Sequence, residues 1–206
     1  MVHLERGAAA AGDHALLRGM FKARKEVFVD LLKWDLPILD EQFEIDAFDN
    51  ERADYLIVAR EDGAHLGSAR LLRSSGPHIL GNLFPFLCAG EVPAGPDILE
   101  ITRFCLDRHQ HARERRKTRN RLVSALVTYA LDHGIHTYTG VAEIRWLQQI
   151  LAFGWRCRPL GLPQQLECGL LGALAIEIDA NTPALLAARG IWTPEPLQSF
   201  ELADAA

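Results

Sequence analysis

The sequence lacks the features that would place this protein in a membrane, in a secretory pathway or around a metal ion. It has no uncharged apolar run of 18 residues, so we expect no membrane span. Its start, Met1 to Gly12, has no basic stretch followed by a long apolar one, which argues against a signal peptide. The four cysteines form no CxxC pair and no cysteine–histidine metal spacing. These absences predict a cytoplasmic protein with reduced thiols and no metal site.

The net charge of −5 conceals one strongly basic segment. Between Arg108 and Arg121, seven Lys and Arg side chains stand against one acid, Glu114, so the rest of the chain is more acidic than the total suggests. Such a patch is either solvated or used on an anionic partner. Nucleic acid is a poor candidate for that partner, because no aromatic residues alternate with the basic ones and the remainder of the chain is acidic.

Length and hydrophobic periodicity indicate a single α/β domain spanning residues 1–206. The chain is 49% hydrophobic, enough to bury a core, and contains no repeats, low-complexity tracts or clear linkers. Apolar and polar residues alternate as strands or recur at helical spacing in a definite order. The predicted elements are a helix capped by Asp13 and reaching Leu32, a hairpin of Tyr55–Arg60 and His65–Leu72 turning at Glu61-Asp62-Gly63, a strand Ile98–Leu106, a helix from the basic segment to about His133 ended by Gly134, a strand Ile135–Ala142, a helix Glu143–Phe153, strands Trp155–Leu160 and Leu174–Ile178, and a short helix Pro183–Arg189.

Several polar residues in the first half lie where packing alone would not require them. Arg24 falls on the apolar stripe of the first helix, so it either reaches the rim or is paired inside a site. Glu100 lies within an apolar strand, where a carboxylate must find partners or have a raised pKa, as a general base does. Strand alternation predicts Glu100 and Thr102 on one face of the sheet and Arg103 on the other. Arg70 could equally be an exposed strand charge.

Four blocks of sequence resemble the signature of the LuxI-type autoinducer synthases. Their order and spacing match across nearly the whole chain, which makes the resemblance more specific than any single block would be. The blocks are Arg24-(x3)-Phe28-(x5)-Trp34, then Asp46-Ala-Phe-Asp49, then Gly67-Ser-Ala-Arg70-Leu-Leu72, and then Glu100-Ile-Thr102-Arg103-Phe104.

This resemblance implies an α/β fold similar to that of the GNAT acyltransferases, with a mixed, mostly antiparallel sheet, a V-shaped split and flanking helices. It implies an acyl-homoserine-lactone synthase, which joins an acyl group to the amine of S-adenosylmethionine and releases methylthioadenosine as the lactone closes. The acyl donor would be acyl carrier protein or, in some members, coenzyme A. S-adenosylmethionine would be a substrate, and no separate cofactor is expected.

The resemblance also implies roles for individual residues. Glu100, as general base, and Arg103 are the catalytic candidates. The candidates for binding S-adenosylmethionine are Arg24, Phe28, Trp34, Asp46, Asp49 and Arg70. Those for the acyl pocket are Thr102, Phe104, Ala142 and Trp146. The candidates for binding the carrier are Arg113, Arg115, Arg116, Lys117 and Arg119.

Two alternative functions and one substrate preference remain to be considered. The segment after the Glu100 strand lacks the glycines of the acetyl-CoA loop, which counts against a GNAT N-acyltransferase that uses acyl-CoA and another amine. A non-catalytic module that binds acyl carriers is the alternative from another class. Ala142 aligns where family members selective for 3-oxo chains have threonine, so we expect a preference for acyl chains unsubstituted at that position.

Overall fold

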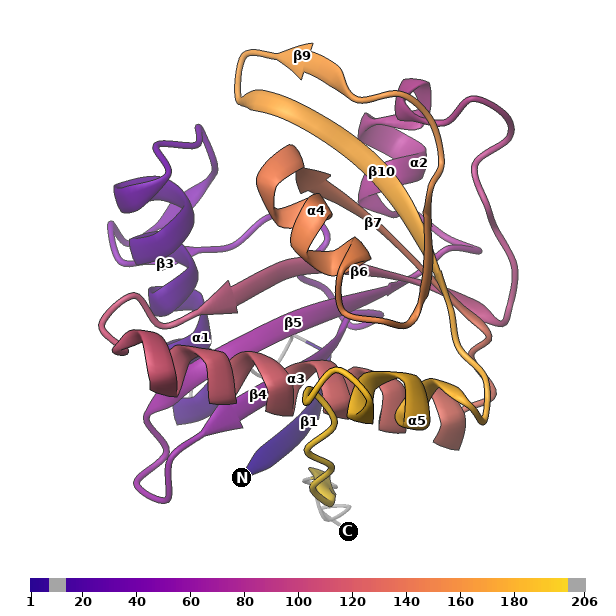
Figure 1. Cartoon of the computed structure of the whole chain (residues 1–206). Coiled ribbons are helices and arrows are strands. Elements are labelled where there is room, and N and C mark those ends of the chain that lie inside the picture. Colours follow the sequence, from indigo (N-terminus) through magenta and orange to yellow (C-terminus); the bar gives the residue numbers. More distant parts are fainter. Residues whose placement is uncertain (8–13, 200–206) are drawn as a thin grey trace, which may run out of the picture.

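The computed structural model describes residues 1–7 and 14–199 and is organised around one large twisted sheet (Figure 1). Within that part of the chain the strands follow the order β11-β1-β4-β5-β6-β7-β10-β8, with β9 pairing beside β10. Among the strands that the structure describes, only β1 with β11 and β6 with β7 are parallel, so the sheet is mixed and mostly antiparallel. The strands are β1 (Val2–Arg6), β4 (Asp54–Ala59), β5 (His65–Arg73), β6 (Ile98–Leu106), β7 (Thr137–Glu143), β8 (Arg156–Pro159), β9 (Gln164–Leu166), β10 (Gly169–Glu177) and β11 (Leu197–Ser199), and a separate ribbon joins β2 (Ile38–Leu39) to β3 (Phe43–Glu44).

Helices cover both faces of the sheet, which explains why β4 is buried along its whole length. Leu56 and Val58 belong to the core that faces the long helix α3, whereas Tyr55 and Ile57 pack against α1. The alternation of a strand thus delivers apolar side chains to two separate layers. The helices are α1 (Ala15–Arg24), α2 (Ile79–Leu83), α3 (Ala112–Asp132), α4 (Ile144–Leu151) and α5 (Thr182–Ala187), with a π-helix η1 (Lys25–Leu31) and a 3₁₀ turn η2 (Pro85–Leu87).

The sheet splits between β6 and β7, as expected. The two strands are paired only from Ile98 opposite Thr137 to Glu100 opposite Thr139, although β6 runs on to Leu106 and β7 to Glu143. Beyond these pairs the strands diverge, and within the described residues β6 and β7 are no longer paired through their backbones. The split opens a V-shaped cleft at the middle of the sheet, next to the residues that follow Glu100.

A β-bulge at Arg103 overturns one prediction from the sequence. Arg70 pairs with Thr102 and Ser68 with Cys105, so Ala69 faces two residues of β6 instead of one. Arg103 has a φ of 48°, a left-handed conformation that is unusual for a side chain with a Cβ. Because the extra residue shifts the alternation, Arg103 joins Thr102 on the α1 face, and the prediction of opposite faces is wrong.

Most predicted elements are present with shifted ends. The hairpin β4–β5 is confirmed, with Gly63 at a φ of 82° in its turn, and Gly134 ends α3 at a φ of 66°. The first helix changes to π geometry after Arg24, and the strand predicted at Leu174–Ile178 begins earlier, at Gly169. The expected Asp13 cap lies outside the described residues. Within them, no helix is long and apolar enough to cross a membrane.

Candidate active site

Three arginines and three carboxylates form one buried cluster on the α1 face of the sheet. Its members come from four segments of the sequence, and Arg24, Arg70 and Glu44 are at most 1% exposed. We call it the arginine–carboxylate cluster; it consists of Arg24, Glu44, Asp46, Asp49, Arg70 and Arg103.

Arg24 and Arg70 hold the two aspartates of the acidic loop in fixed positions. Arg24 donates to both oxygens of Asp49 at 2.8 Å and through Nε to Glu44 at 2.6 Å. Arg70 donates to both oxygens of Asp46, at 2.6 and 3.1 Å, and to Thr102 Oγ1 at 2.9 Å. These forked contacts match the planar guanidinium to the planar carboxylate, which makes them strong and directional.

Arg103 closes the cluster on the side of the cavity. It donates to Glu44 Oε1 at 3.0 Å and to Asp46 Oδ2 at 2.7 Å, both from Nη2. The side chains of Arg103 and Asp46 are about a tenth exposed, unlike the completely buried Asp49 and Glu44. Within the described residues the Nη1 atom of Arg103 makes no hydrogen bond. Arg103 and Asp46 are therefore the members that can contact a ligand.

The three guanidinium groups and three carboxylates of the cluster balance in formal charge, and the pKa shifts of Asp49 and Arg24 both favour the charged form. Burial alone would raise the pKa of Asp49, but the hydrogen bonds and charges of Arg24 and Arg70 hold it well below its usual range. For Arg24, burial works against the charged form, and the pKa is nevertheless raised because Asp49, Glu44 and Asp46 surround it. With three cations and three anions, the cluster adds little net charge to the cavity beside it.

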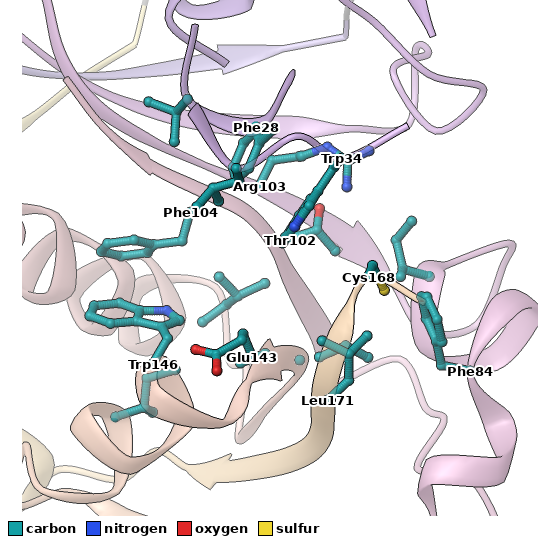
Figure 2. A pocket seen from close by; sticks show the side chains of 18 of the residues that line it. Phe28, Trp34, Phe84, Thr102, Arg103, Phe104, Glu143, Trp146, Cys168 and Leu171 are labelled. Carbon is teal, nitrogen blue, oxygen red and sulfur yellow. The ribbon is translucent and has the colours of Figure 1, made fainter. Parts of the chain in front are cut away.

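A cavity of about 1430 Å³ opens between the cluster and the V-shaped split. Small-molecule pockets usually occupy 300–1,000 Å³, so this one has room for two ligands side by side. On the side of the cluster, the rings of Phe28 and Trp34 stack with centroids 5.2 Å apart, and the Arg103 guanidinium lies over Phe28. Figure 2 shows Phe28, Trp34, Arg103 and Thr102 gathered at this end.

The other half of the cavity is aromatic and apolar. Phe104 and Trp146 face one another with ring centroids 5.2 Å apart (Figure 2). Trp146 also contacts the ring of Phe153, which in turn contacts that of Trp155. We call these four residues the aromatic wall. Ala142 lines the same half, as do Leu126, Leu174 and Ile176. The structure thus brings the predicted acyl-pocket residues Thr102, Phe104, Ala142 and Trp146 to one cavity.

Glu100 lies just outside this cavity and is completely buried. Its two oxygens accept the backbone N–H groups of Ile79 and Leu80, at 2.7 and 2.8 Å, in the first turn of α2. Burial raises the pKa of Glu100 to about 7, although these two hydrogen bonds oppose the shift. Its pKa suits a proton acceptor, while its contacts make it the anchor of α2. Its role as the base stays a prediction.

The predicted carrier-binding residues divide into two groups at the start of α3. Arg115 is turned inward: it lines the cavity and donates to the carbonyls of Leu106 and Asp107, both at 3.0 Å. Arg119 lies over the ring of Phe153, with its Cζ 4.9 Å from the ring centroid. The remaining three are exposed, and we call them the basic turn: Arg113, Arg116 and Lys117.

The sequence interpretation missed three residues of the site. Glu44 joins Arg24 to Arg103, but in the sequence it is one acid among several in an acidic loop. Tyr55 donates to Asp49 Oδ1 at 2.9 Å from a strand that looked purely apolar. Glu143 was assigned to the start of a helix, yet it lines the cavity. Its place in the sequence, where the predicted strand Ile135–Ala142 meets the following helix, could have indicated a cavity position, because the end of that strand borders the split.

Comparison with known proteins identifies the family. The family model described as autoinducer synthase matches residues 10–184. This chain belongs to the autoinducer synthase family. An acyl-homoserine-lactone synthase of Rhizobium etli is 36% identical over 146 residues, which are 68% of this chain and 68% of that protein. The resemblance inferred from the four sequence blocks is confirmed.

Solved structures agree with this assignment. The CoA-dependent acyl-homoserine lactone synthase BjaI, in complex with SAM and isopentyl-CoA, superposes with a TM-score of 0.84 at 26% identity, covering 98% of this chain and 94% of that one. A protein described as an N-acetyltransferase of Lactobacillus plantarum shares the fold alone, with a TM-score of 0.56 at 14% identity over 86% of this chain and 99% of that one. The chain is an acyltransferase of the autoinducer synthase family with a GNAT-like fold.

Proposed function

We propose that this protein transfers an acyl group from a carrier thioester to the amine of S-adenosylmethionine and then closes the lactone, producing a quorum-sensing signal in the cytoplasm. The proposal treats residues 1–206 as one catalytic domain without a further cofactor or metal. It rests mainly on one observation: a single cavity combines a half lined by charged and stacked aromatic groups with an apolar half. BjaI, the neighbour with TM-score 0.84, was solved with SAM and isopentyl-CoA, ligands of these two kinds.

The polar half suits S-adenosylmethionine. The stacked rings of Phe28 and Trp34 offer a face to the adenine. The free Nη1 of Arg103 can receive the methionine carboxylate, and the exposed edge of Asp46 can receive the ammonium group. Arg24, Arg70, Asp49 and Glu44 do not face the cavity; they hold these two residues in place, so we assign them a positioning role.

The chemistry takes place in two balanced steps. The α-amine, with a reference pKa near ~8, first loses a proton. We assign that proton to Glu100 through water, since its pKa of about 7 is suitable but its oxygens do not line the cavity. The amine attacks the thioester carbonyl, the C–N bond forms, and the C–S bond breaks to release the carrier thiol. The methionine carboxylate then attacks the carbon next to the sulfonium, and neutral methylthioadenosine leaves.

The donor is, in our proposal, acyl carrier protein. The exposed basic turn of Arg113, Arg116 and Lys117 lies beside Arg115, which lines the cavity, so an acidic carrier docked there could insert its arm into the split. Coenzyme A is the second candidate, favoured by the likeness to a CoA-dependent synthase.

The test is product analysis with purified protein. We expect S-adenosylmethionine plus acyl-carrier-protein or acyl-CoA thioesters to give acyl-homoserine lactone and methylthioadenosine in equal amounts by mass spectrometry. Amide formation with other amines and without methylthioadenosine would support an ordinary N-acyltransferase instead. Binding of acyl carriers without turnover would contradict the proposal and support a non-catalytic module.

A further inference from the structure

One carboxylate in the apolar half of the cavity, that of Glu143, forms no ion pair within the described residues. Glu143 is the last residue of β7 and the N-cap of α4, where its Oε2 accepts the backbone N–H of Arg145 at 3.0 Å. Within the described residues, Oε1 accepts no hydrogen bond and Glu143 forms no ion pair. The side chain of Arg145 is exposed and borders the same cavity, but it forms no ion pair with Glu143.

Contacts with strand β10 fix the position of Glu143. Its backbone pairs with Leu171 of β10, and a Cβ placed on Gly169 would lie 4.0 Å from the Glu143 Cγ, so the stem runs close to the start of that strand. Figure 2 shows the carboxylate pointing into the cavity on the side of Trp146. Trp146 and Phe104, its aromatic neighbours there, offer no donor for the free oxygen except the single indole N–H.

This carboxylate differs from the three acids of the arginine–carboxylate cluster. Glu44, Asp46 and Asp49 are all paired with guanidinium groups, so their charge is compensated inside the protein. Glu143 has no such guanidinium partner in the described residues; its partly exposed carboxylate faces the cavity and the water that fills it. An alkyl chain that displaces water from Oε1 leaves a carboxylate oxygen without a hydrogen-bond donor, which is unfavourable. A ligand hydroxyl can replace that water by donating to Oε1. A ligand carbonyl cannot, because its oxygen and Oε1 are both acceptors and no hydrogen bond forms between them.

We propose that Glu143 determines acyl specificity and selects acyl groups that carry a hydroxyl, which donates to its free carboxylate oxygen. This inference rests on the proposed function and names its acyl substrate class. The expected order is hydroxyacyl first, unsubstituted acyl second and 3-oxoacyl last. The discrimination against 3-oxo chains that we expected from the sequence is kept, but its cause changes. Instead of Ala142 offering the 3-oxo carbonyl no donor, Glu143 sets an acceptor against that carbonyl.

The experiment compares thioesters of one chain length on the carrier that the enzyme uses: octanoyl, 3-hydroxyoctanoyl, 8-hydroxyoctanoyl and 3-oxooctanoyl. For the natural protein, at least one hydroxyacyl donor should exceed octanoyl in kcat/KM by roughly tenfold, a difference equal to one good hydrogen bond. The two hydroxyl positions report how deep along the chain Glu143 acts. Octanoyl equal to or better than both hydroxy donors overturns the inference.

Two variants isolate the carboxylate without removing the helix cap. Glu143→Gln keeps the shape and an acceptor oxygen for Arg145 N–H, but adds N–H donors; Glu143→Ser keeps a cap and withdraws the carboxylate from the cavity. The serine variant should lose the hydroxyl preference, and the glutamine variant, whose N–H donates to a hydroxyl or a carbonyl alike, should improve 3-oxooctanoyl relative to octanoyl by about tenfold. Glu167→Gln, an exposed acid at the rim of the same cavity, is the matched control and should leave the order unchanged.

The outcomes separate the two proposals. If lactone forms but both variants keep the natural order of donors, the inference about Glu143 is wrong and the proposed function stands. If no donor in the panel gives lactone, the proposed function itself is contradicted. The ranking measured on the natural protein decides the inference even if a variant does not fold.

Discussion

The arginine–carboxylate cluster and the aromatic wall border one cavity but are held together by different forces. The cluster is fixed by directed, charge-assisted contacts such as the paired bonds of Arg24 to Asp49, and a shift of a fraction of an ångström would break several of them. The wall depends on ring packing, supplemented by a hydrogen bond from Trp155 Nε1 to the carbonyl of Ile150 at 2.9 Å and by the Arg119 guanidinium over Phe153. Directed contacts suit S-adenosylmethionine, a substrate of fixed shape. Ring packing tolerates an acyl chain, whose length can vary. This difference is what the two proposed substrates require.

The largest expected effect comes from breaking the cluster itself. Arg24→Ala leaves Asp49 and Glu44 buried without their main cation, so the free energy of unfolding should fall by about 3–5 kcal/mol. Lys22→Ala, an exposed change on the same helix, is the control and should stay within about 0.5 kcal/mol. Urea denaturation measures both. A loss below about 1 kcal/mol for Arg24→Ala would show that the cluster tolerates an unpaired charge.

A substitution at Glu100 tests whether this residue takes the proton of the substrate amine in addition to anchoring α2. Glu100→Gln keeps the side-chain shape and an acceptor for α2 but cannot take the amine proton, so turnover should fall by roughly 100-fold or more. Binding of S-adenosylmethionine, measured by calorimetry, should change little. Near-normal turnover would remove Glu100 from the mechanism and leave it only as the anchor of α2.

The raised pKa of Glu100 also predicts how stability depends on pH. Between about pH 4.5 and 7, the folded protein holds a proton on Glu100 that the unfolded chain has lost. Rising pH therefore favours the unfolded state in this window, by about 1.4 kcal/mol for each pH unit, and no further above it. Glu100→Gln should remove this component of the slope. Identical slopes in both proteins, from denaturation at several pH values, would show that Glu100 is ionised throughout.

The sequence predicted much of this arrangement because local patterns determine it. The hairpin follows from strand alternation and from Gly63 in the turn. Arg24, on an apolar stripe, was expected either at the rim or paired inside a site, and the structure shows it buried and paired. What sequence could not supply is contact between distant segments. Strand β1 lies between β4 and the C-terminal β11, and Val2–Arg6 alone is too short to reveal those partners.

The errors at the site have the same origin. Nothing local separates Glu44, which is completely buried, from the exposed Glu41 three residues before it. The face of Arg103 was assigned by simple alternation, and a bulge that depends on the pairing with β5 reversed it. Glu143 was interpreted only as the start of a helix, because the split that exposes it is formed by strands far apart in the sequence.

A smaller effect is expected at the basic turn. Replacing Arg113, Arg116 and Lys117 with glutamate should raise KM for acyl carrier protein by roughly five- to tenfold at low salt and weaken its salt dependence. KM for S-adenosylmethionine should hold steady, which separates this surface from the cavity. Unchanged carrier kinetics together with efficient use of acyl-CoA would show that the turn is only a solvated helix face.

The division of the cavity into two substrate halves is tested most directly by a matched pair of tryptophan variants. KM for both substrates is measured in Trp34→Ala, beside the cluster, and in Trp146→Ala, in the aromatic wall. Each loses one large ring that lines the cavity. We predict that Trp34→Ala raises KM for S-adenosylmethionine by about tenfold or more and leaves that for the acyl donor within about twofold, with the reverse for Trp146→Ala. If each variant alters both KM values equally, or if the two effects are exchanged, the two-half account of the cavity is wrong.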